Sequence, residues 1–245
     1  MKVRIWMERM VILDLLAVAL LLFVRGFVEP AVEAHSAAVV QADAQWNAEA
    51  GQPMTQDSTG QAGKVALTFD DGPHPKYTAE LLDGLKERGV HATFFVTGEH
   101  AEQYPELIKR MSEEGHLIGN HTYSHIQLKK SNHEKFKEEL IKTNEIISDI
   151  TGRDVTFVRP PYGTWEKKFE TELNMFPVLW NIDPLDWCSD NADCVSRKVL
   201  NKVKENDIIL LHDQYESSVQ AALAIVDAMQ EEGYEFVTVE EILFD

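Results

Sequence analysis

Short apolar runs alternate with segments of helical periodicity from about residue 64 onward. Brief apolar runs are typical of buried strands, whereas leucines and isoleucines spaced three or four apart are typical of helices. The expected strands cover residues 65–69, 93–96, 117–119, 156–158, 178–180, 208–211 and 236–237. The clearest helices are expected over residues 77–88, 104–114 and 133–150, each followed within two residues by a glycine. This alternation predicts an α/β fold of parallel βα units, in an open sheet or a closed barrel.

The N-terminal part of the chain has a different pattern. Residues 11–24 are apolar except for Asp14, and three basic residues precede them. That order is typical of an export signal or membrane anchor. A buried core helix is the alternative, because 14 residues are short for a membrane span. We therefore expect a signal or anchor in residues 1–28 with its N-terminus inside, a flexible linker in 29–62, and a folded domain in 63–245 outside the cytoplasm.

Composition narrows the range of partners. The 245 residues include 23 basic and 41 acidic side chains, for a formal net charge of −18. An acidic chain is repelled by phosphate backbones, so nucleic acid is not an expected partner. The hydrophobic share of 44% is enough for a packed core and argues against general disorder. Two cysteines are too few for a disulfide scaffold or a four-thiolate zinc site.

Polar residues of catalytic types follow five of the expected strands. Because the carboxyl ends of parallel strands open on one face, these side chains can converge. In chain order the groups are Asp70-Asp71, His121 with His125, Arg159, Asp186-Trp187 and His212. A single polar residue after a strand is commonly just a turn residue, but five such groups in succession indicate a functional site.

Two of these groups could bind a metal ion. His121 and His125 are four residues apart, so a helical turn or tight loop can aim both imidazoles in one direction. A carboxylate from another strand would complete a set suited to zinc or a similar divalent ion. Beside a cation, one member of the Asp70-Asp71 pair can coordinate while the other acts as a base. Considered separately, the histidines also fit a polar surface loop, and the aspartates an Asx turn.

Five motifs in this order resemble those of the polysaccharide deacetylase family, the NodB-homology group. They are TFDDGP at 68–73, HTYSH at 121–125, RPPYG at 159–163, DPLDW at 183–187 and LLH at 210–212. The Asp-Asp form of the first motif, with His74 and Pro75 after it, is similar to that of peptidoglycan N-acetylglucosamine deacetylases and chitin-type deacetylases. The resemblance covers about residue 64 to the C-terminus. It implies a distorted (β/α) barrel, with residues 63–245 as the catalytic domain.

The resemblance also implies a metal centre and a general base. Asp71, His121 and His125 would bind a divalent ion, expected to be Zn2+, with Co2+ or Ni2+ as alternatives. Asp70 would be the general base, held in place by Arg159. Amide hydrolysis needs an activated nucleophile and a stabilised oxyanion, and a bound cation contributes to both.

The remaining motif residues would complete the site. His212 would be the general acid, oriented by Asp186, and an imidazole suits this role because its ordinary pKa of about 6.5 lies near working pH. The backbone N–H of Tyr162 would help to stabilise the oxyanion. Three residues would line the substrate pocket, where an apolar wall suits the methyl of an acetyl group. They are Trp187, Leu210 and Pro161.

The implied activity is removal of N-acetyl groups from GlcNAc residues of a cell-surface polysaccharide, with release of acetate. Peptidoglycan and chitin-like oligomers are the candidate substrates. The nearest alternative is O-acetyl removal from xylan-like polymers, and a catalytically inactive glycan-binding relative represents a different class. The complete set Asp70, Asp71, His121, His125 and His212 favours an active enzyme. We expect a monomer that is either anchored to the membrane or secreted.

Cys188 and Cys194 lie just beyond Trp187 and outside the family motifs. Outside the cell they could form a disulfide that closes a short loop beside the pocket. Two free thiols or an accessory metal site are the alternatives. We expect the disulfide.

Overall fold

The computed structural model describes residues 63–244. The anchor expected in residues 1–28 and the linker expected in 29–62 therefore lie outside the described residues. Within 63–244, no helix combines the length and the apolar character that a membrane crossing requires.

The domain is built on a curled sheet in which every strand pairing is parallel. The strands are β1 (Lys64–Asp70), β2 (Thr93–Val96), β3 (Leu117–Asn120), β4 (Phe157–Val158), β5 (Phe176–Pro177), β6 (Ile208–His212) and β7 (Glu235–Val237). Their spatial order is β5-β4-β3-β2-β1-β6, and β7 pairs with the first half of β1. Beyond β5, Ile182 forms a parallel bridge with Ile209 of β6. This irregular segment links the two ends of the sheet and confirms the distorted (β/α) barrel.

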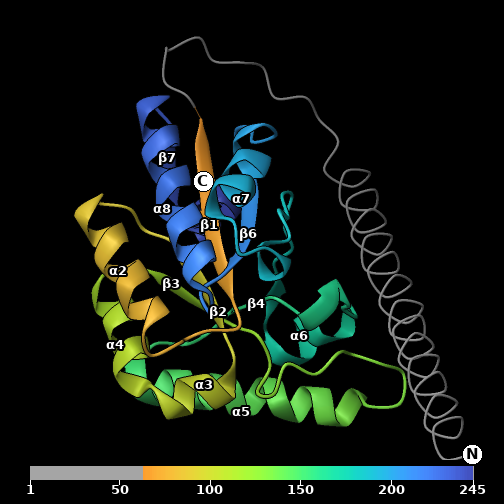
Figure 1. Cartoon of the computed structure of the whole chain (residues 1–245). Coiled ribbons are helices and arrows are strands. Elements are labelled where there is room, and N and C mark those ends of the chain that lie inside the picture. The colour runs from red at the N-terminus through yellow and green to blue at the C-terminus, as the bar shows by residue number, and fades with distance from the viewer. Residues whose placement is uncertain (1–62, 245) are drawn as a thin grey trace, which may run out of the picture. The chain divides into compact units, whose positions relative to one another are not determined.

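Helices follow most of the strands and cover the outside of the sheet (Figure 1). They are α2 (Tyr77–Glu87), α3 (Gly98–Gln103), α4 (Pro105–Glu113), α5 (His133–Thr151), α6 (Lys168–Leu173), α7 (Ala192–Leu200), α8 (Glu216–Glu231) and α9 (Val239–Phe244). Two short 3-10 turns, η1 (Pro161–Gly163) and η2 (Asp186–Cys188), follow β4 and β5. The predicted ends of α2 and α5 are confirmed, because Gly89 and Gly152 adopt left-handed φ angles of 64° and 69° just after these helices.

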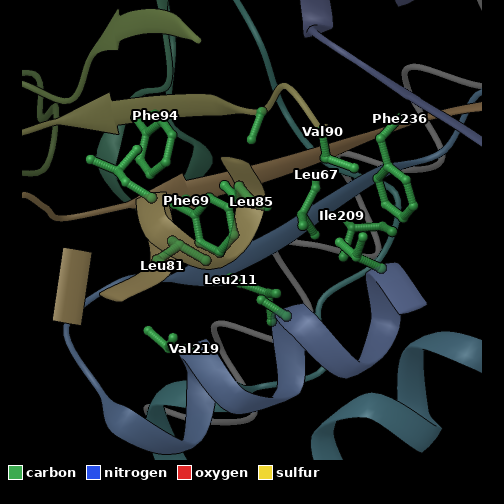
Figure 2. Close-up of a cluster of buried hydrophobic side chains, with 14 of the residues drawn as sticks. Leu67, Phe69, Leu81, Leu85, Val90, Phe94, Ile209, Leu211, Val219 and Phe236 are labelled. Atoms are coloured by element: carbon green, nitrogen blue, oxygen red, sulfur yellow. The ribbon is translucent and has the colours of Figure 1, made fainter. Parts of the chain in front are cut away.

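Alternation along β1 separates a helix-facing core from the interior of the barrel. Val65, Leu67 and Phe69 point outward into the large core under the helices. Figure 2 shows this core, with Leu81 and Leu85 of α2 and Val219 of α8 around the strand side chains. The intervening residues of β1 face the other side, where Ala66 packs among Phe95, Phe157 and Val178.

The same alternation places the polar end of β1 inside the barrel. Thr68 and Asp70 are buried and lie on the face of Ala66, so both side chains point inward. In the neighbouring β6, Leu210 lies opposite Thr68 and His212 lies opposite Asp70. Strand geometry alone therefore brings the first and last motifs together.

One expected strand needs correction, and one helix was not expected. The strand predicted over residues 178–180 is wrong, since β5 is Phe176–Pro177. The carbonyls of Val178 and Leu179 instead accept hydrogen bonds from the Arg159 side chain, which diverts this segment from regular pairing. The helix predicted over residues 104–114 is preceded by a separate helix, α3, that the sequence pattern did not indicate.

Candidate active site

The turn after β1 carries the two adjacent carboxylates in different environments. Asp70, the last residue of β1, is only 3% exposed. Asp71 adopts a left-handed φ of 72°, and its side chain is 28% exposed. Gly72 follows under the carboxylate of Asp213, where a Cβ atom would lie 2.3 Å from both carboxylate oxygens. Glycine is therefore the residue that fits at this position.

Asp71, His121 and His125 form a compact set of metal donors. The Oδ1 atom of Asp71 lies 3.3 Å from Nε2 of each histidine. Two ligands about 2.1 Å from a tetrahedral zinc ion lie about 3.4 Å apart, so this spacing fits a shared ion. Oδ1 of Asp71 is buried and has no hydrogen-bond partner, as expected for an atom aimed at a cation.

The orientation of His121 also suits metal binding. Its Nδ1 lies 2.6 Å from the carbonyl oxygen of Arg159, which can only accept, so Nδ1 carries the proton. In the neutral imidazole, the lone pair of Nε2 is then free for a metal ion. Burial alone would raise the pKa of Asp71, but the His121, His125 and His212 imidazoles hold that pKa well below its ordinary value. Asp71 is accordingly ionised and suited to bind a cation.

Arg159 is a fully buried cation that holds Asp70. Its Nη1 donates to Asp70 Oδ1 at 2.8 Å and to Thr68 Oγ1 at 2.7 Å. Nε and Nη2 donate to the carbonyls of Val178 and Leu179, and the guanidinium lies 4.2 Å from the ring centroid of Phe95. Burial lowers the pKa of Arg159, and the charge of Asp70 opposes that shift. The pair fixes the carboxylate at the edge of the metal-donor set.

His212 and Asp186 form a second fixed pair beside the donors. His212 Nδ1 lies 2.8 Å from Asp186 Oδ1, and the other oxygen of Asp186 accepts from the His212 main-chain N–H and from Ser218. Burial alone would lower the pKa of His212, but the Asp186 hydrogen bond and charge raise it to about 9. His212 Nε2 lies 4.0 Å from Asp71 Oδ2. The imidazole therefore faces the site, and Asp186 favours its protonated form.

The expected pocket residues and Tyr162, the expected oxyanion residue, differ in exposure. Leu210 is buried and shares the inward face of β6 with His212, and Pro161 is buried in η1. Tyr162 and Trp187 are 46% and 41% exposed, and the Tyr162 ring lies 5.1 Å from that of His125. The last two residues lie on the rim of the site, not in a closed pocket.

The expected disulfide is absent from the structure, since Cys188 and Cys194 are free thiols. Cys188 belongs to η2, and its Sγ donates to the Leu185 carbonyl. Cys194 lies in the first turn of α7, capped by Asn191. Each cysteine is thus held by its own local turn, and their closeness in sequence does not bring the sulfurs together.

Four further residues near the site had not been predicted from the sequence. His100 and Gln214 both contact the main-chain carbonyl of Asp71 at 2.7 Å. Glu139 of α5 accepts hydrogen bonds from the N–H and hydroxyl of Ser124, inside the loop that carries both histidine ligands. Tyr215 is 43% exposed beside the His212–Asp186 pair. Gln214 and Tyr215 closely follow the LLH motif, and this closeness in sequence is the feature that could have indicated their place near the site.

The Asp-His-His donor set lies at the carboxyl edge of a curled parallel sheet, with Asp70 and His212 beside it, an arrangement typical of metal-dependent hydrolases with a NodB-type barrel. Comparison with known proteins agrees. A model of the polysaccharide deacetylase domain matches residues 57–178. The chain belongs to the polysaccharide deacetylase family, whose members in carbohydrate esterase family 4 are metal-dependent.

Two of the relatives with curated descriptions are peptidoglycan deacetylases. A peptidoglycan-N-acetylglucosamine deacetylase of Bacillus cereus is 42% identical over 182 residues, which cover 71% of this chain. The peptidoglycan-N-acetylmuramic acid deacetylase PdaC of Bacillus subtilis is 39% identical over 178 residues, covering 73% of this chain. The chain spans 66% of the length of the first relative and 38% of the second.

Solved structures share the fold. That of PdaC aligns with a TM-score of 0.72 and 38% identity over 75% of this chain and 91% of the solved chain. A family 4 acetyl xylan esterase from Clostridium thermocellum, solved in complex with a cobalt ion, aligns with a TM-score of 0.68 and 34% identity, over 73% of this chain and 89% of that one.

Proposed function

We propose that this chain is a metal-dependent deacetylase that removes N-acetyl groups from GlcNAc residues of peptidoglycan or a chitin-like glycan and releases acetate. The observation that carries the proposal is the Asp71–His121–His125 donor set, which lies between a buried carboxylate and a protonated imidazole. These are the parts that amide hydrolysis requires.

Zn2+ is the ion we propose for this donor set, with Co2+ and Ni2+ as alternatives. Two imidazole nitrogens and one carboxylate oxygen at tetrahedral spacing support zinc and leave a position for water and substrate. The bound ion would supply polarisation of the acetyl carbonyl and a lowered pKa of water.

Asp70 accepts the proton of the attacking water in this proposal, and Arg159 is the residue that positions it. Asp70 Oδ1 is occupied by the guanidinium, whereas Oδ2 lies 3.8 Å from His121 Nε2. Oδ2 therefore faces the donor set and is the oxygen suited to receive the proton.

His212 donates a proton to the leaving nitrogen, and Asp186 orients it. Because Asp186 binds Nδ1, the proton available to the substrate is the one on Nε2, which faces Asp71. The main-chain N–H of Tyr162 stabilises the oxyanion. Leu210, Pro161 and Trp187 form an apolar wall for the acetyl methyl group, and this wall disfavours longer acyl chains.

The N-terminal segment gives the proposed location of the enzyme. We propose that residues 1–28 anchor or export the chain with its N-terminus inside, so that the catalytic domain of 63–245 acts on the cell wall as a monomer. The basic residues before the apolar run and the acidic residues after it support this orientation. Fractionation of cells that express the full chain or residues 29–245 tests it, since only the full chain is expected in the membrane or the medium.

Acetate release from peptidoglycan, chitotetraose and acetylated xylan tests the activity. We expect release from the two N-acetylated glycans, its loss in EDTA and its return with Zn2+. The similarity to an acetyl xylan esterase makes xylan the informative third substrate, and release from xylan alone would replace the amidase proposal with an esterase. Full activity in EDTA, or in His121→Ala, would refute the metal site.

A further inference from the structure

One short segment contacts both loops that carry the metal donors. It consists of residues 97–100, which are the N-cap and the first turn of α3. The Thr97 N–H donates to the carbonyl of Gly72, next to Asp71. The N–H groups of Gly98 and Glu99 donate to the carbonyls of Thr122 and Tyr123, between His121 and His125. These three main-chain bonds connect the two donor loops through one segment.

His100 strengthens the connection at its Asp71 end. Its Nδ1 lies 2.7 Å from the Asp71 carbonyl oxygen, and that oxygen can only accept, so Nδ1 is protonated and donates. The amide of Gln214, which follows the neighbouring strand β6, donates to the same oxygen at 2.7 Å. Two donors from different elements thus fix the peptide that follows the Asp71 side chain.

The donor loops need such support because their backbones are strained. Asp71, Thr122 and His125 have φ angles of 72°, 63° and 55°, a region that costs a non-glycine residue roughly 1–3 kcal/mol. Without outside hydrogen bonds, each loop would relax toward ordinary φ values and turn its ligand away. The surrounding contacts must therefore hold the ligands in place.

Gly98 allows the segment 97–100 to approach the histidine loop closely. A Cβ atom there would lie 2.6 Å from the Tyr123 ring, 3.2 Å from the Tyr123 Cα and 2.5 Å from Thr143 Oγ1. Any side chain at this position would push the segment away from the histidine loop. Glycine at the start of α3 thus allows the two N–H donors to reach their carbonyls.

We propose that residues 97–100, together with Gln214, form a brace that sets the separation of Asp71 from His121 and His125, with His100 as its main positioning side chain. The proposal rests on the metal site of the proposed function and adds residues that do not bind the metal ion themselves. Groups that orient metal ligands typically contribute about 10–100-fold to metal affinity. The brace therefore predicts an effect on metal binding without any substrate present.

Titration of the metal-free full chain with Co2+, followed by visible absorption and chelator competition, tests the brace. His100→Leu removes the donor, whereas His100→Asn keeps an N–H near the position of Nδ1. We expect Co2+ affinity to fall about 10–100-fold in His100→Leu and to recover in His100→Asn. Gly98→Ala should also weaken binding, although alanine favours helices. His91→Leu, at an exposed histidine before β2, is the matched control and should bind as wild type.

Thermal unfolding of the metal-free proteins separates positioning from general destabilisation. A positioning role predicts unchanged melting temperatures beside weakened Co2+ binding. If His100→Leu does not fold, Gln214→Met provides the same test from the other donor. Wild-type affinity in His100→Leu and Gly98→Ala would overturn the brace and leave the deacetylase proposal standing. A wild-type chain that binds Co2+ but releases no acetate would overturn the deacetylase proposal and leave the brace standing. A wild-type chain that binds no Co2+ would overturn both proposals.

Discussion

Arg159 should be the most costly side chain of the site to remove. It is 0% exposed, forms four hydrogen bonds and neutralises Asp70, which is 3% exposed. Arg159→Met keeps much of the volume beside Phe95 but leaves the Asp70 carboxylate buried without a counter-charge. Removing one partner of a buried ion pair costs about 3–5 kcal/mol. We expect the free energy of unfolding to fall by about that amount, a large part of the stability of a typical domain.

Urea unfolding of the metal-free proteins measures this cost, and a double-mutant cycle assigns its cause. In the Asp70→Asn background no carboxylate remains to be stranded, so Arg159→Met should cost at least about 1 kcal/mol less than in the wild type. Arg159→Lys keeps the charge but cannot supply all four bonds, and it should be intermediate. A loss below about 1 kcal/mol for Arg159→Met, or an equal loss in both backgrounds, would refute the buried-pair reasoning.

The other predictions concern proton transfer and the rim. Asp186→Asn should lower the pKa of His212 from about 9 toward its ordinary 6.5, and the alkaline limb of the kcat/KM profile should move to lower pH. An alkaline limb that does not move would contradict the pairing of His212 with Asp186. The raised pKa of His212 stabilises the fold fully below the pKa of the unfolded state, and this stabilisation is lost as the pH rises through the folded pKa. Asp186→Asn should therefore lower the free energy of unfolding, measured in urea, more at pH 6 than at pH 10. Tyr215→Ala should reduce kcat/KM for chitotetraose by roughly fivefold, about 1 kcal/mol of stacking, with little change for monomeric GlcNAc; an equal loss on both substrates would argue against sugar stacking.

Much of the fold was predictable because buried parallel strands are short apolar runs with distinct ends. The strand over 93–96 and the end of the helix at Gly152 are confirmed for this reason. The strand expected at 178–180 was wrong because its carbonyls bind Arg159, an interaction that hydrophobicity does not encode. Helix α3 was missed because its six residues show no apolar periodicity.

The site was predictable only where the residue type at a strand end itself indicates a chemical role. His121, His125 and His212 carry their function in their residue type, and the structure brings them together with the two aspartates. The support of Asp71 by His100 could not be predicted, because it depends on a main-chain carbonyl that any residue would offer. The disulfide expectation failed because sequence spacing does not determine which way Cys188 points.

Acetate release by zinc-loaded Asp70→Asn, measured beside the zinc-loaded wild type on the same peptidoglycan, tests the central claim most directly. Quantifying bound Zn2+ in both proteins shows that the substitution leaves the donor set intact. The account predicts that the wild type releases acetate and that Asp70→Asn does so at least about 100-fold more slowly with the same zinc content. Equal rates for the two proteins, or no acetate from the wild type, would contradict it.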